Sequence, residues 1–427
     1  MKILIVTVHF PPENVVASLR LYSFAYYWHI AGHNITILTA TKNKKDTDLE
    51  FDCSAFKIIE IPIPIISKFQ RFNSNSNNIS NINKLEYFFK LIFFPFKILF
   101  KTISNKTGCF SERFPSFTDL WTKKAIKLIN AFDFDVVLSS GGPYSVHRVG
   151  LSLKKLNKNI KWIVDWRDLW LKNPSYKGLR IFHFHEKKLE KIFHNNANLI
   201  TCVSEPNSNI LSNTTATSVK TIYNGFLPIQ SIRSNVNNNK EIDKFIIVYT
   251  GSIYRDLQDP SPIFDAISRI KSKNINLYNK LLIQFAGLSS NIIDIIKKYN
   301  IIDCYNYLGY VKLEESLILQ YNANAVLFID YNTEIEGFIS AKIFEYLYYS
   351  KSIIAIGNNP NSSAAKLIKE TNSGVYLGLN VDLIEQYLTE IIIDHAKYEY
   401  KKNDSIILEY TRENQANKLL NYIIQLN

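Results

Sequence analysis

Short apolar runs recur along the chain, and stretches with helical periodicity separate most of them. The first run, Ile3–Thr7, is apolar at nearly every position, which is typical of a parallel strand buried on both faces. Ser18–Ala31 has the pattern of a helix, and Gly32 follows it where a helix-ending glycine is expected. Strands that alternate with helices predict βαβ units around a parallel sheet.

The same alternation continues through the first half of the chain and starts again in the second half. The further strands that it predicts are Ile35–Leu38, Val136–Ser139, Trp162–Trp166, Leu199–Val203, Val219–Tyr223, Phe245–Tyr249, Leu281–Phe285, Tyr305–Leu308, Ala325–Ile329 and Ile353–Ile356. Residues 227–243 are polar, rich in Asn and without periodicity, so they predict a linker. We therefore expect an α/β class protein with domains at 1–226 and 244–404 and a C-terminal helix within 405–427.

Length and composition agree with two folded domains. The chain has 427 residues and is 46% hydrophobic, which excludes a wholly disordered protein. Its formal charge of +12 is compatible with a phosphate-bearing ligand, nucleic acid or an anionic membrane. Because Lys is abundant together with Ile and Asn, as in AT-rich coding sequences, we regard this charge as permissive only.

The cysteines and the start of the sequence indicate a cytoplasmic protein. The four cysteines, Cys53, Cys109, Cys202 and Cys304, are far apart and lack metal-type spacing, so we expect reduced thiols. Because the sequence begins directly with a predicted strand, we expect no signal peptide. The sequence contains no run of about 18 uncharged apolar residues, so we expect no transmembrane helix.

Residues 73–106 interrupt the α/β pattern. An Asn/Ser tract at Asn73–Asn83 is followed by the aromatic segment Tyr87–Lys101, in which lysines recur. A basic, aromatic, amphipathic helix of this kind lies in a membrane interface. We expect the segment to bind an anionic membrane and hold the protein at the inner face of the cytoplasmic membrane. A helix packed on the first domain is the alternative.

Lys342 and Glu345 are the first candidates for ligand binding. They are three residues apart in a predicted helix, so they share one face of that helix. In an open α/β sheet, ligands bind where strands end and helices begin. There Lys342 could contact a phosphate and Glu345 could accept hydrogen bonds from a ribose diol. The alternative is an ordinary ion pair on a helix surface.

Charged and polar residues also follow the predicted strands of the first half. Asp165, Arg167 and Asp168 come together at a strand end, where unpaired charges are hard to explain as core residues. A structural Asp–Arg pair between two loops is the alternative. In Ser139–His147, two glycines expose amide groups at a helix start that could bind an anion. His147 itself is as readily a structural histidine as a ligand.

The segment Ser340–Leu347 resembles the S-K-x-F-E-Y-L signature of glycosyltransferase family 4. This resemblance implies the GT-B fold, in which two Rossmann-like domains with parallel sheets face a central cleft. It also implies that Glu345 holds the donor ribose. A second Glu of the family signature is replaced by Gly337, and Glu336 lies one residue earlier.

Several further segments resemble the same family. Phe10–Glu13 with Arg20 is similar to its P-P-E…R opening, with Val15–Ala17 where the family has glycines. Ile163–Trp170 is similar to a D-F-R-D-P-W motif of polysaccharide-synthesising members. The segment Thr250–Arg255 resembles a G-x-x-x-x-R loop that contacts the donor pyrophosphate. Gly309 matches a strand-end glycine near the base and ribose.

The resemblance implies a retaining glycosyltransferase that transfers a sugar from a nucleotide-sugar donor to a glycan or lipid-linked glycan, in the synthesis of cell-surface polysaccharides such as capsule or O-antigen. It also implies that the C-terminal helix crosses back to the first domain. The site residues that it assigns are Arg167, Asp168, Arg255 and Lys342 for catalysis, Gly251, Arg255, Gly309, Glu336, Lys342 and Glu345 for the donor, and Glu13, His147 and Asp165 on the acceptor side.

Other chemistries have less support. Asp133 and Asp135 imitate a metal-binding D-x-D motif, but we expect no metal because no cluster of ligands accompanies them. We expect no cofactor, since neither a GxGxxG nor a Walker motif occurs. Nucleic acid is not an expected partner. Two alternatives remain: a nucleotide-sugar 2-epimerase of the same fold, which would need His/Glu acid–base pairs, and an inactive GT-B binding or scaffold protein, which the missing glycines at Val15–Ala17 favour.

Overall fold

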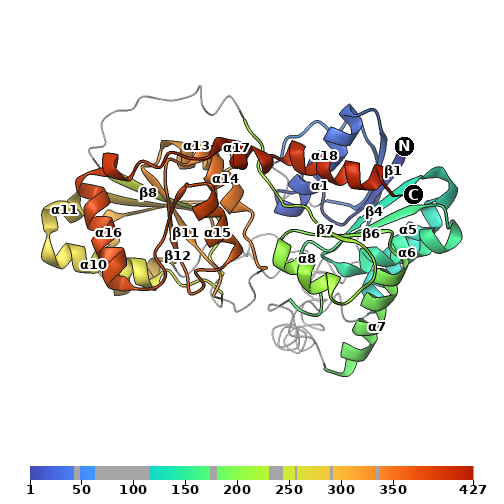
Figure 1. Ribbon diagram of the computed structural model, residues 1–427, viewed down its shortest axis with the longest axis horizontal. Coiled ribbons are helices and arrows are strands. Elements are labelled where there is room, and N and C mark those ends of the chain that lie inside the picture. Colours follow the sequence, from blue (N-terminus) through green and yellow to red (C-terminus); the bar gives the residue numbers. More distant parts are fainter. Residues whose placement is uncertain are drawn as a thin grey trace, which may run out of the picture. The chain divides into compact units, whose positions relative to one another are not determined.

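The protein consists of two compact units (Figure 1). The computed structural model describes residues 1–42, 49–62, 115–173, 180–229, 244–254, 257–288, 292–332 and 337–426, with the side chains of all but 115–120, 180–182 and 397. Unit 1 comprises Met1–Ile222 and Ala416–Asn427, and unit 2 comprises Tyr223–Gln415. The Asn/Ser tract, the Tyr87–Lys101 segment and most of the predicted linker lie outside the described residues.

Unit 1 is built on a parallel sheet of seven strands within the described residues, in the order β3-β2-β1-β4-β5-β6-β7. Its strands are β1 (Lys2–Val6), β2 (Asn34–Ala40), β3 (Lys57–Ile61), β4 (Val136–Ser140), β5 (Lys161–Asp165), β6 (Leu199–Cys202) and β7 (Val219–Thr221). In register, Ile3 of β1 lies opposite Ile35 of β2 and Val136 of β4.

Helices cover both faces of this sheet. They are α1 (Val16–Ile30), α5 (Pro115–Leu128), α6 (His147–Leu156), α7 (Arg180–Asn196), α8 (Glu205–Ser212) and α18 (Arg412–Ile424), with 3₁₀ turns η1 (Ala131–Asp133) and η2 (Tyr144–Val146). Successive strand residues point to opposite faces. Ile3 and Ile5 therefore join one hydrophobic cluster with α1 and α18, whereas Leu4 and Val6 join another with α5, α6 and α7.

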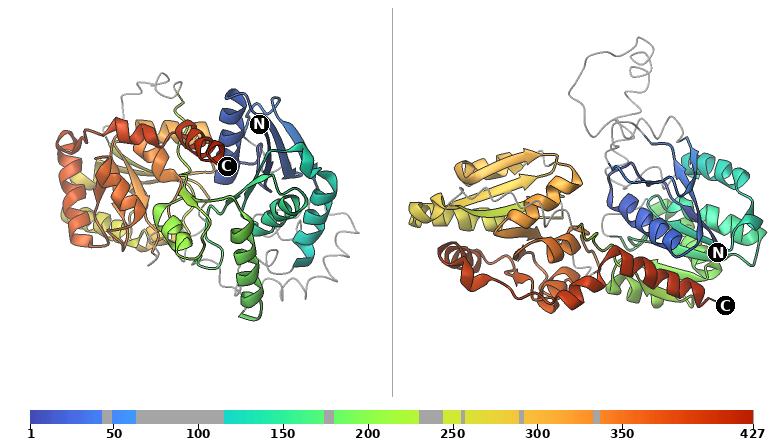
Figure 2. Two further views of the ribbon diagram at one scale, coloured as in Figure 1. Left: turned by 45° about the vertical axis from the view of Figure 1, so that its right-hand side comes forward. Right: turned by 90° about the horizontal axis from the view of Figure 1, so that it is seen from above.

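The C-terminal helix α18 packs beside α1 in unit 1 (Figure 2). Trp28 of α1 is fully buried, and its indole Nε1–H donates a hydrogen bond to the Ala416 carbonyl at 2.9 Å. Gly32 follows α1 with φ +84°, a conformation that glycine adopts without a steric cost, and the His33 amide donates back to the Trp28 carbonyl. The helix end predicted at Gly32 is therefore confirmed.

Unit 2 has a second parallel sheet, with six strands among the described residues in the order β10-β9-β8-β11-β12-β13. Its strands are β8 (Phe245–Thr250), β9 (Leu281–Ala286), β10 (Tyr305–Gly309), β11 (Ala325–Ile329), β12 (Ile353–Ile356) and β13 (Gly374–Tyr376). Both sheets are parallel and alternate with helices, so the predicted pair of Rossmann-like halves is confirmed.

The helices of unit 2 again cover both faces of the sheet (Figure 1). They are α10 (Ser261–Lys273), α11 (Ile275–Asn279), α12 (Ile292–Lys298), α13 (Leu313–Asn322), α14 (Lys342–Tyr349), α15 (Ser363–Glu370), α16 (Val381–Ile393) and α17 (Asp404–Glu409), with 3₁₀ turns η3 (Ile302–Cys304) and η4 (His395–Tyr398). α10 and α16 share one hydrophobic cluster with β8 and β9. Phe328 of β11 points to the opposite face, where its ring meets Tyr346 of α14 at 6.3 Å.

Two edge strands and one helix break were not predicted. β3 and β13 lie at sheet edges, and their short, half-exposed sequences lack the apolar runs of the central strands. The C-terminal region forms α17 and α18 where the sequence pattern predicted one helix. The interruption occurs because Tyr410 and Arg412 exchange backbone hydrogen bonds with Phe226, so these groups are not available to a continuous helix.

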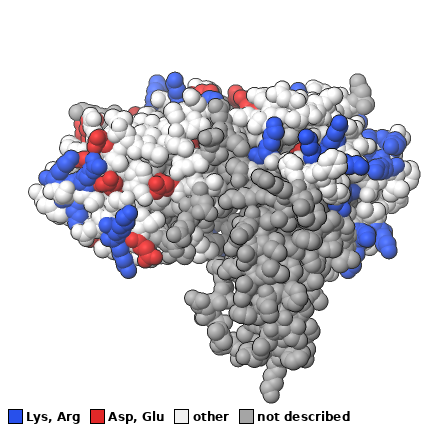
Figure 3. Space-filling model, turned by 90° about the horizontal axis from the view of Figure 1, so that it is seen from below, with Lys and Arg blue, Asp and Glu red and all other residues white. Residues whose placement is uncertain are grey.

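The two units differ in the charged side chains that they display on one face. On the face shown in Figure 3, unit 1 displays mostly Lys and Arg, whereas unit 2 displays charges of both signs. Among the helices that the structure describes, none has the length and apolar character needed to span a bilayer.

Candidate functional site

Each sheet has one position where its strand order reverses. In unit 1, β2 and β3 lie on one side of β1, and β4 lies on the other; in unit 2, β9 and β10 lie on one side of β8, and β11 on the other. Parallel α/β sheets bind ligands at the carboxyl ends of the strands at such a reversal. The carboxyl ends of β1 and β4 therefore define a unit 1 site, and those of β8 and β11 define a unit 2 site.

Glycines form the floor of the unit 2 site. Gly251 follows β8 with φ +100°, in the region that favours glycine. A Cβ atom on Gly287, which follows β9, would lie only 2.3 Å from the Gly251 carbonyl oxygen. The Gly287 amide in turn donates to the Gly309 carbonyl at 2.6 Å. The structure thus brings the predicted donor-binding residues Gly251 and Gly309 into one tightly packed layer of backbone, joined through Gly287.

Lys342, the first residue of α14, extends over this layer. Its Nζ donates a hydrogen bond to the Tyr249 hydroxyl at 2.8 Å and lies 4.1 Å from the centroid of the Tyr249 ring. A Cβ atom on Gly251 would lie 3.1 Å from the same Nζ. The ammonium group is therefore held beside the loop that follows β8, where a ligand at the strand ends would meet it.

Tyr249 holds Lys342 because its own position is fixed. The ring is fully buried, stacks on Phe285 with centroids 4.8 Å apart, and donates its hydroxyl hydrogen to the Ser252 carbonyl at 3.0 Å. The oxygen lone pairs are left to accept from Lys342. This role of Tyr249 was not predicted, because a tyrosine within an apolar strand has the pattern of a core residue.

Burial lowers the pKa of Lys342 to about 7, and the attraction of Glu345 opposes this only partly. A lysine with that pKa is about half protonated at neutral pH. An anion bound at Nζ would favour the charged form and raise the pKa. The site therefore couples anion binding to proton uptake near neutral pH.

Glu345 lies one turn further along α14 and is half-buried. Burial raises the pKa of this carboxyl group, and the positive charge of Arg412 is the strongest effect in the opposite direction. The predicted face that Lys342 and Glu345 share on one helix is present. Lys342 is nevertheless bound to Tyr249, so the pair differs from a simple ion pair on a helix surface.

A buried polar network attaches α14 to the end of β8. The Thr250 amide donates to the Tyr346 hydroxyl at 3.0 Å, and Gln320 Nε2 donates to the Thr250 hydroxyl at 3.1 Å. Tyr346 and Gln320 are both fully buried. This network positions the first turn of α14, which carries Lys342 and Glu345. Two other predicted donor residues, Arg255 and Glu336, lie outside the described residues.

In unit 1, Asp165 at the end of β5 forms a buried ion pair with Arg20 of α1. The carboxylate accepts from Arg20 Nη2 at 2.9 Å and from the hydroxyls of Ser140 and Thr201 at 2.8 Å. Burial alone would raise the pKa of Asp165, but the charge and hydrogen bonds of Arg20 lower it below its usual range. Asp165 therefore forms a structural Asp–Arg pair, as in the alternative interpretation of this segment, and its partner is Arg20.

Arg167 has a different environment. Its backbone is left-handed, with φ +50°, which is uncommon for a residue with a side chain and marks local strain. The guanidinium donates from Nε to the Gly141 carbonyl at 2.6 Å and from Nη2 to the Gly142 carbonyl at 3.2 Å. A Cβ atom on Gly142 would lie 2.4 Å from Nη2. Asp168 is exposed next to this side chain.

His147 is enclosed in the unit 1 core. It is fully buried, its Nδ1 lies 2.8 Å from the Ser139 hydroxyl, and its ring packs against Trp166 at 4.5 Å. Burial lowers its pKa to about 3, so the ring is neutral at physiological pH. This geometry fits a structural histidine below the Gly141–Gly142 turn better than direct contact with an acceptor.

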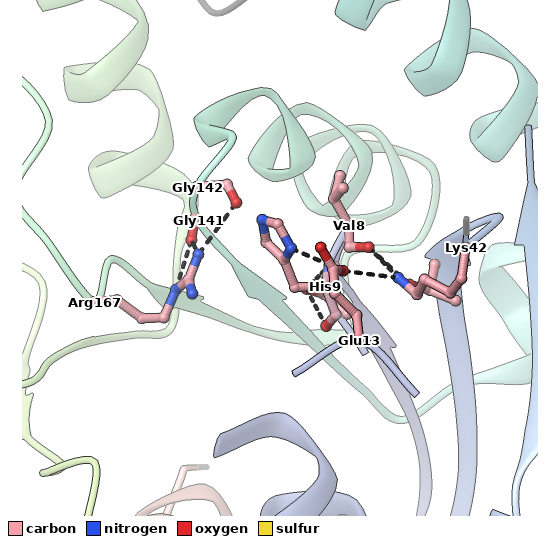
Figure 4. A network of polar contacts seen from close by, with 9 residues as sticks. Val8, His9, Glu13, Lys42, Gly141, Gly142 and Arg167 are labelled. Atoms are coloured by element: carbon pink, nitrogen blue, oxygen red, sulfur yellow. Dashed lines mark hydrogen bonds and ion pairs between the residues drawn. The ribbon is translucent and has the colours of Figure 1, made fainter. Parts of the chain in front are cut away.

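His9, Glu13 and Lys42 form a second network at the unit 1 site (Figure 4). His9 Nδ1 lies 3.0 Å from Glu13 Oε2, and Lys42 Nζ lies 3.7 Å from the same oxygen. Lys42 also donates to the carbonyl of Val8. Glu13 was among the predicted acceptor-side residues, whereas His9 and Lys42 were not. The four-residue spacing of His9 and Glu13 in the loop after β1 was the available signal.

A metal centre is not evident in the described part of the chain, which holds no group of three or more His, Cys, Asp and Glu side chains suited to one. Of the D-x-D pair, Asp135 accepts from the Lys2 amide at 2.7 Å and Asp133 accepts from Asn130 at 3.1 Å. Both carboxylates thus take part in local structure at the amino ends of the strands, away from the carboxyl ends where the two sites lie.

Residues 102–226 match the family model described as Glycosyltransferase Family 4. No curated protein sequence matches the chain. Solved structures match over its whole length at low identity, and likeness at this level shows the fold. Sucrose-phosphate synthase from Thermosynechococcus elongatus has a TM-score of 0.63 at 14% identity, covering 100% of this chain and 99% of that chain.

Two further structures cover nearly the whole of both chains. A mutant of TarM from S. aureus, in complex with fondaparinux, alpha-GlcNAc-glycerol and UDP, has a TM-score of 0.56 at 13% identity and covers 99% of each chain. A putative UDP-N-acetylglucosamine 2-epimerase from Listeria monocytogenes has a TM-score of 0.54 at 10% identity and covers 99% of this chain and 95% of that chain. Together with the two parallel sheets, these matches show the GT-B fold, and the family match over residues 102–226 supports the resemblance to glycosyltransferase family 4 seen in the sequence.

Proposed function

We propose that the protein transfers a sugar from a nucleotide-sugar donor, bound at the unit 2 site, to a glycan or lipid-linked glycan acceptor, bound at the unit 1 site. The observation that carries the proposal is Lys342, which Tyr249 holds over the glycine floor of the unit 2 site. A tightly packed layer of glycine backbone with one positioned cation suits a diphosphate, because backbone can approach the phosphates closely and the ammonium offsets their charge.

Glu345 would bind the ribose of the donor, and Gly251 and Gly309 would lie under the nucleotide. Arg255 and Glu336 are proposed to take part on the grounds of the family resemblance alone. During transfer, negative charge develops on the departing diphosphate, and Lys342 and Arg255 would stabilise it. Preorganised charge of this kind is usually the largest single contribution to catalysis.

At the unit 1 site, Arg167 and Asp168 would contact the reacting groups, and Glu13 would act on the acceptor side. Asp165 and His147 are buried, so we propose that they act by positioning. Asp165 fixes the end of β5, which leads directly to Arg167. His147 supports the Gly141–Gly142 turn, whose carbonyls bind Arg167.

The proposal has four further parts: retention of the anomeric configuration, a role in cell-surface polysaccharide synthesis, a cytoplasmic location, and attachment to an anionic membrane through Tyr87–Lys101. The first two rest on the family resemblance, and the last on the basic, aromatic sequence of that segment.

Flotation with anionic liposomes tests the attachment to a membrane. Replacing Phe93, Phe94 and Phe96 with Ser should release the protein, and a wild-type protein that does not float would contradict membrane binding.

One observation favours a second function, a nucleotide-sugar 2-epimerase. That reaction requires acid–base groups, and the His9–Glu13 pair is such a group. The two functions differ in their products, because an epimerase returns a nucleotide sugar with the opposite configuration at C2 and needs no acceptor. Incubation with nucleotide sugar alone, followed by NMR of the sugar ring protons, would show the epimer.

Thermal unfolding with a panel of nucleotides and nucleotide sugars tests the proposal. A ligand present at 100 times its Kd should stabilise the protein by about 2.7 kcal/mol, and the best donor should be recognised by the largest rise in Tm. Mass spectrometry of the product with candidate acceptors then tests transfer. If no nucleotide sugar shifts the Tm of the wild type, the proposed donor site is wrong.

A further inference from the structure

The loop after β1 brings an imidazole and a carboxylate together at the unit 1 site. His9 follows the end of β1 and has a side chain that is 25% exposed, whereas the Glu13 side chain is only 11% exposed. The contact is made by one nitrogen, Nδ1, at 3.0 Å from Glu13 Oε2. Lys42, whose side chain is 7% exposed, lies 3.7 Å from the same carboxylate oxygen and helps to hold it in place.

The second nitrogen of His9 points the other way. Figure 4 shows the ring between Glu13 on one side and the Arg167–Gly142 turn on the other. Within the described part of the chain, His9 Nε2 has no hydrogen-bond partner, whereas Nδ1 is bound to Glu13. A neutral imidazole that donates Nδ1–H to a carboxylate presents an unprotonated Nε2.

The charges around His9 favour that neutral state. Burial is the main effect and lowers its pKa below 6.5, and the positive charges of Arg167 and Lys42 lower it further. Glu13 acts in the opposite direction through its hydrogen bond and its charge. At neutral pH the ring is therefore a free base, oriented by a carboxylate and directed toward the strained residue Arg167.

We propose that His9 is the proton acceptor for the acceptor hydroxyl, with Glu13 as its positioning partner. The inference rests on the proposed glycosyltransferase function. As the hydroxyl oxygen forms its bond to the anomeric carbon of the donor, the bond from that carbon to the diphosphate breaks, and the diphosphate leaves with the electron pair. The hydroxyl proton passes to His9 Nε2, Glu13 stabilises the imidazolium, and the proton is then released to solvent.

This step concerns only the fate of the proton. The neighbouring Arg167 would orient the acceptor, because its guanidinium is already fixed by the carbonyls of Gly141 and Gly142.

The test compares His9→Gln and Glu13→Gln with the wild type, and uses His185→Gln, an exposed histidine on α7, as the matched control. Release of nucleoside diphosphate from the donor identified by the thermal panel is measured from pH 5 to 8, with water or a sugar as acceptor. His9→Gln should lower kcat by about 10²–10⁴-fold, the usual range for a general base, and should abolish the fall of kcat/KM at acid pH. His185→Gln should behave as the wild type.

Glu13→Gln provides a readout that a purely structural role would not give. Because Glu13 raises the pKa of His9, its loss should move the acid limb of kcat/KM to lower pH while kcat falls. An unchanged limb in Glu13→Gln, or wild-type kcat in His9→Gln, would overturn the inference. The Tm shift with nucleotide is recorded for each variant. If the wild type binds the nucleotide sugar and transfers the sugar, but kcat of His9→Gln equals that of the wild type, only this inference fails. If the wild type binds no nucleotide sugar, the proposed function fails as well.

Discussion

The two sites lie at equivalent places in their sheets but use charge in opposite ways. In unit 1 the charged groups are largely satisfied within the protein: Arg20 pairs with Asp165, and Arg167 binds two carbonyls. In unit 2, Lys342 is held by a neutral phenol. A cation oriented by a phenol keeps its charge available to an anion, whereas one paired with a carboxylate does not. The unit 2 site is therefore suited to a diphosphate, and the unit 1 site to neutral hydroxyl groups.

The largest effect should come from breaking the buried pair in unit 1. Arg20→Ala would leave Asp165 charged and unpaired in a site with 0% exposure. Removing one member of a buried ion pair costs about 3–5 kcal/mol of folding free energy. Denaturant unfolding should show this loss, while a variant of an exposed cation such as Lys273→Ala should change stability by less than about 1 kcal/mol.

The same pair predicts a loss of stability in acid. The pKa of Asp165 is lowered in the folded protein, so its contribution is present above the unfolded pKa of about 3.9 and is lost as pH falls below that value. Wild type and Arg20→Ala should therefore converge in stability at low pH. A difference that stays constant down to pH 2 would show that the ion pair does not contribute as described.

In unit 2, Glu345→Ala should weaken the binding of nucleoside and of nucleoside diphosphate to the same extent, because both ligands would make the ribose contact. The loss of a charged hydrogen-bond acceptor should cost about 1.5–3 kcal/mol, or about 10–150-fold in Kd. Isothermal calorimetry with both ligands measures it. Wild-type affinity for the nucleoside in this variant would place the ribose elsewhere.

Much of the fold could be predicted from the sequence because its central strands are continuous apolar runs. Ala325–Ile329 and Ile353–Ile356 were predicted to the residue. The edge strands β3 and β13 were missed since a half-exposed strand has no such run. Lys342 and Glu345 were found because they are close in sequence. Tyr249 could not be found, because its contact with Lys342 joins residues 93 positions apart.

The acceptor side was harder to predict for the same reason. Arg20 and Asp165 are 145 residues apart, so their pairing is a property of the sheet and not of a local motif. His9 lies in a loop beside apolar residues, and only the tertiary structure shows that its ring faces Glu13 on one side and Arg167 on the other.

A smaller effect is expected when the support of Lys342 is removed and Lys342 itself is kept. Tyr249→Phe deletes the oxygen that accepts from Nζ, and a typical intramolecular hydrogen bond contributes about 0.5–1.5 kcal/mol. The Kd for nucleoside diphosphate should rise by about 2–13-fold, with little change for the nucleoside. In a Lys342→Met background the same change should have no further effect on the diphosphate, and an additive loss would contradict the positioning role.

Removal of metal should have the smallest effect. Because the sequence offers no ligand cluster beyond Asp133 and Asp135, transfer in excess EDTA should proceed at the rate seen without it. Activity that disappears with EDTA and returns with Mg²⁺ or Mn²⁺ would contradict this expectation, and Asp135→Asn would then show whether that pair is responsible.

The central claim, that the charge of Lys342 binds the donor diphosphate, is tested most directly by calorimetry at pH 7 and pH 9. With a pKa of about 7, Lys342 is about 1% protonated at pH 9, so the affinity of the wild type for a nucleoside diphosphate should fall by up to about 50-fold between the two values. Binding near pH 7 should take up protons, and affinity for the nucleoside should not change. Lys342→Met should bind the diphosphate weakly at both pH values. A wild type whose diphosphate affinity is the same at pH 7 and pH 9, or a Lys342→Met variant that keeps the wild-type pH dependence, would contradict the account.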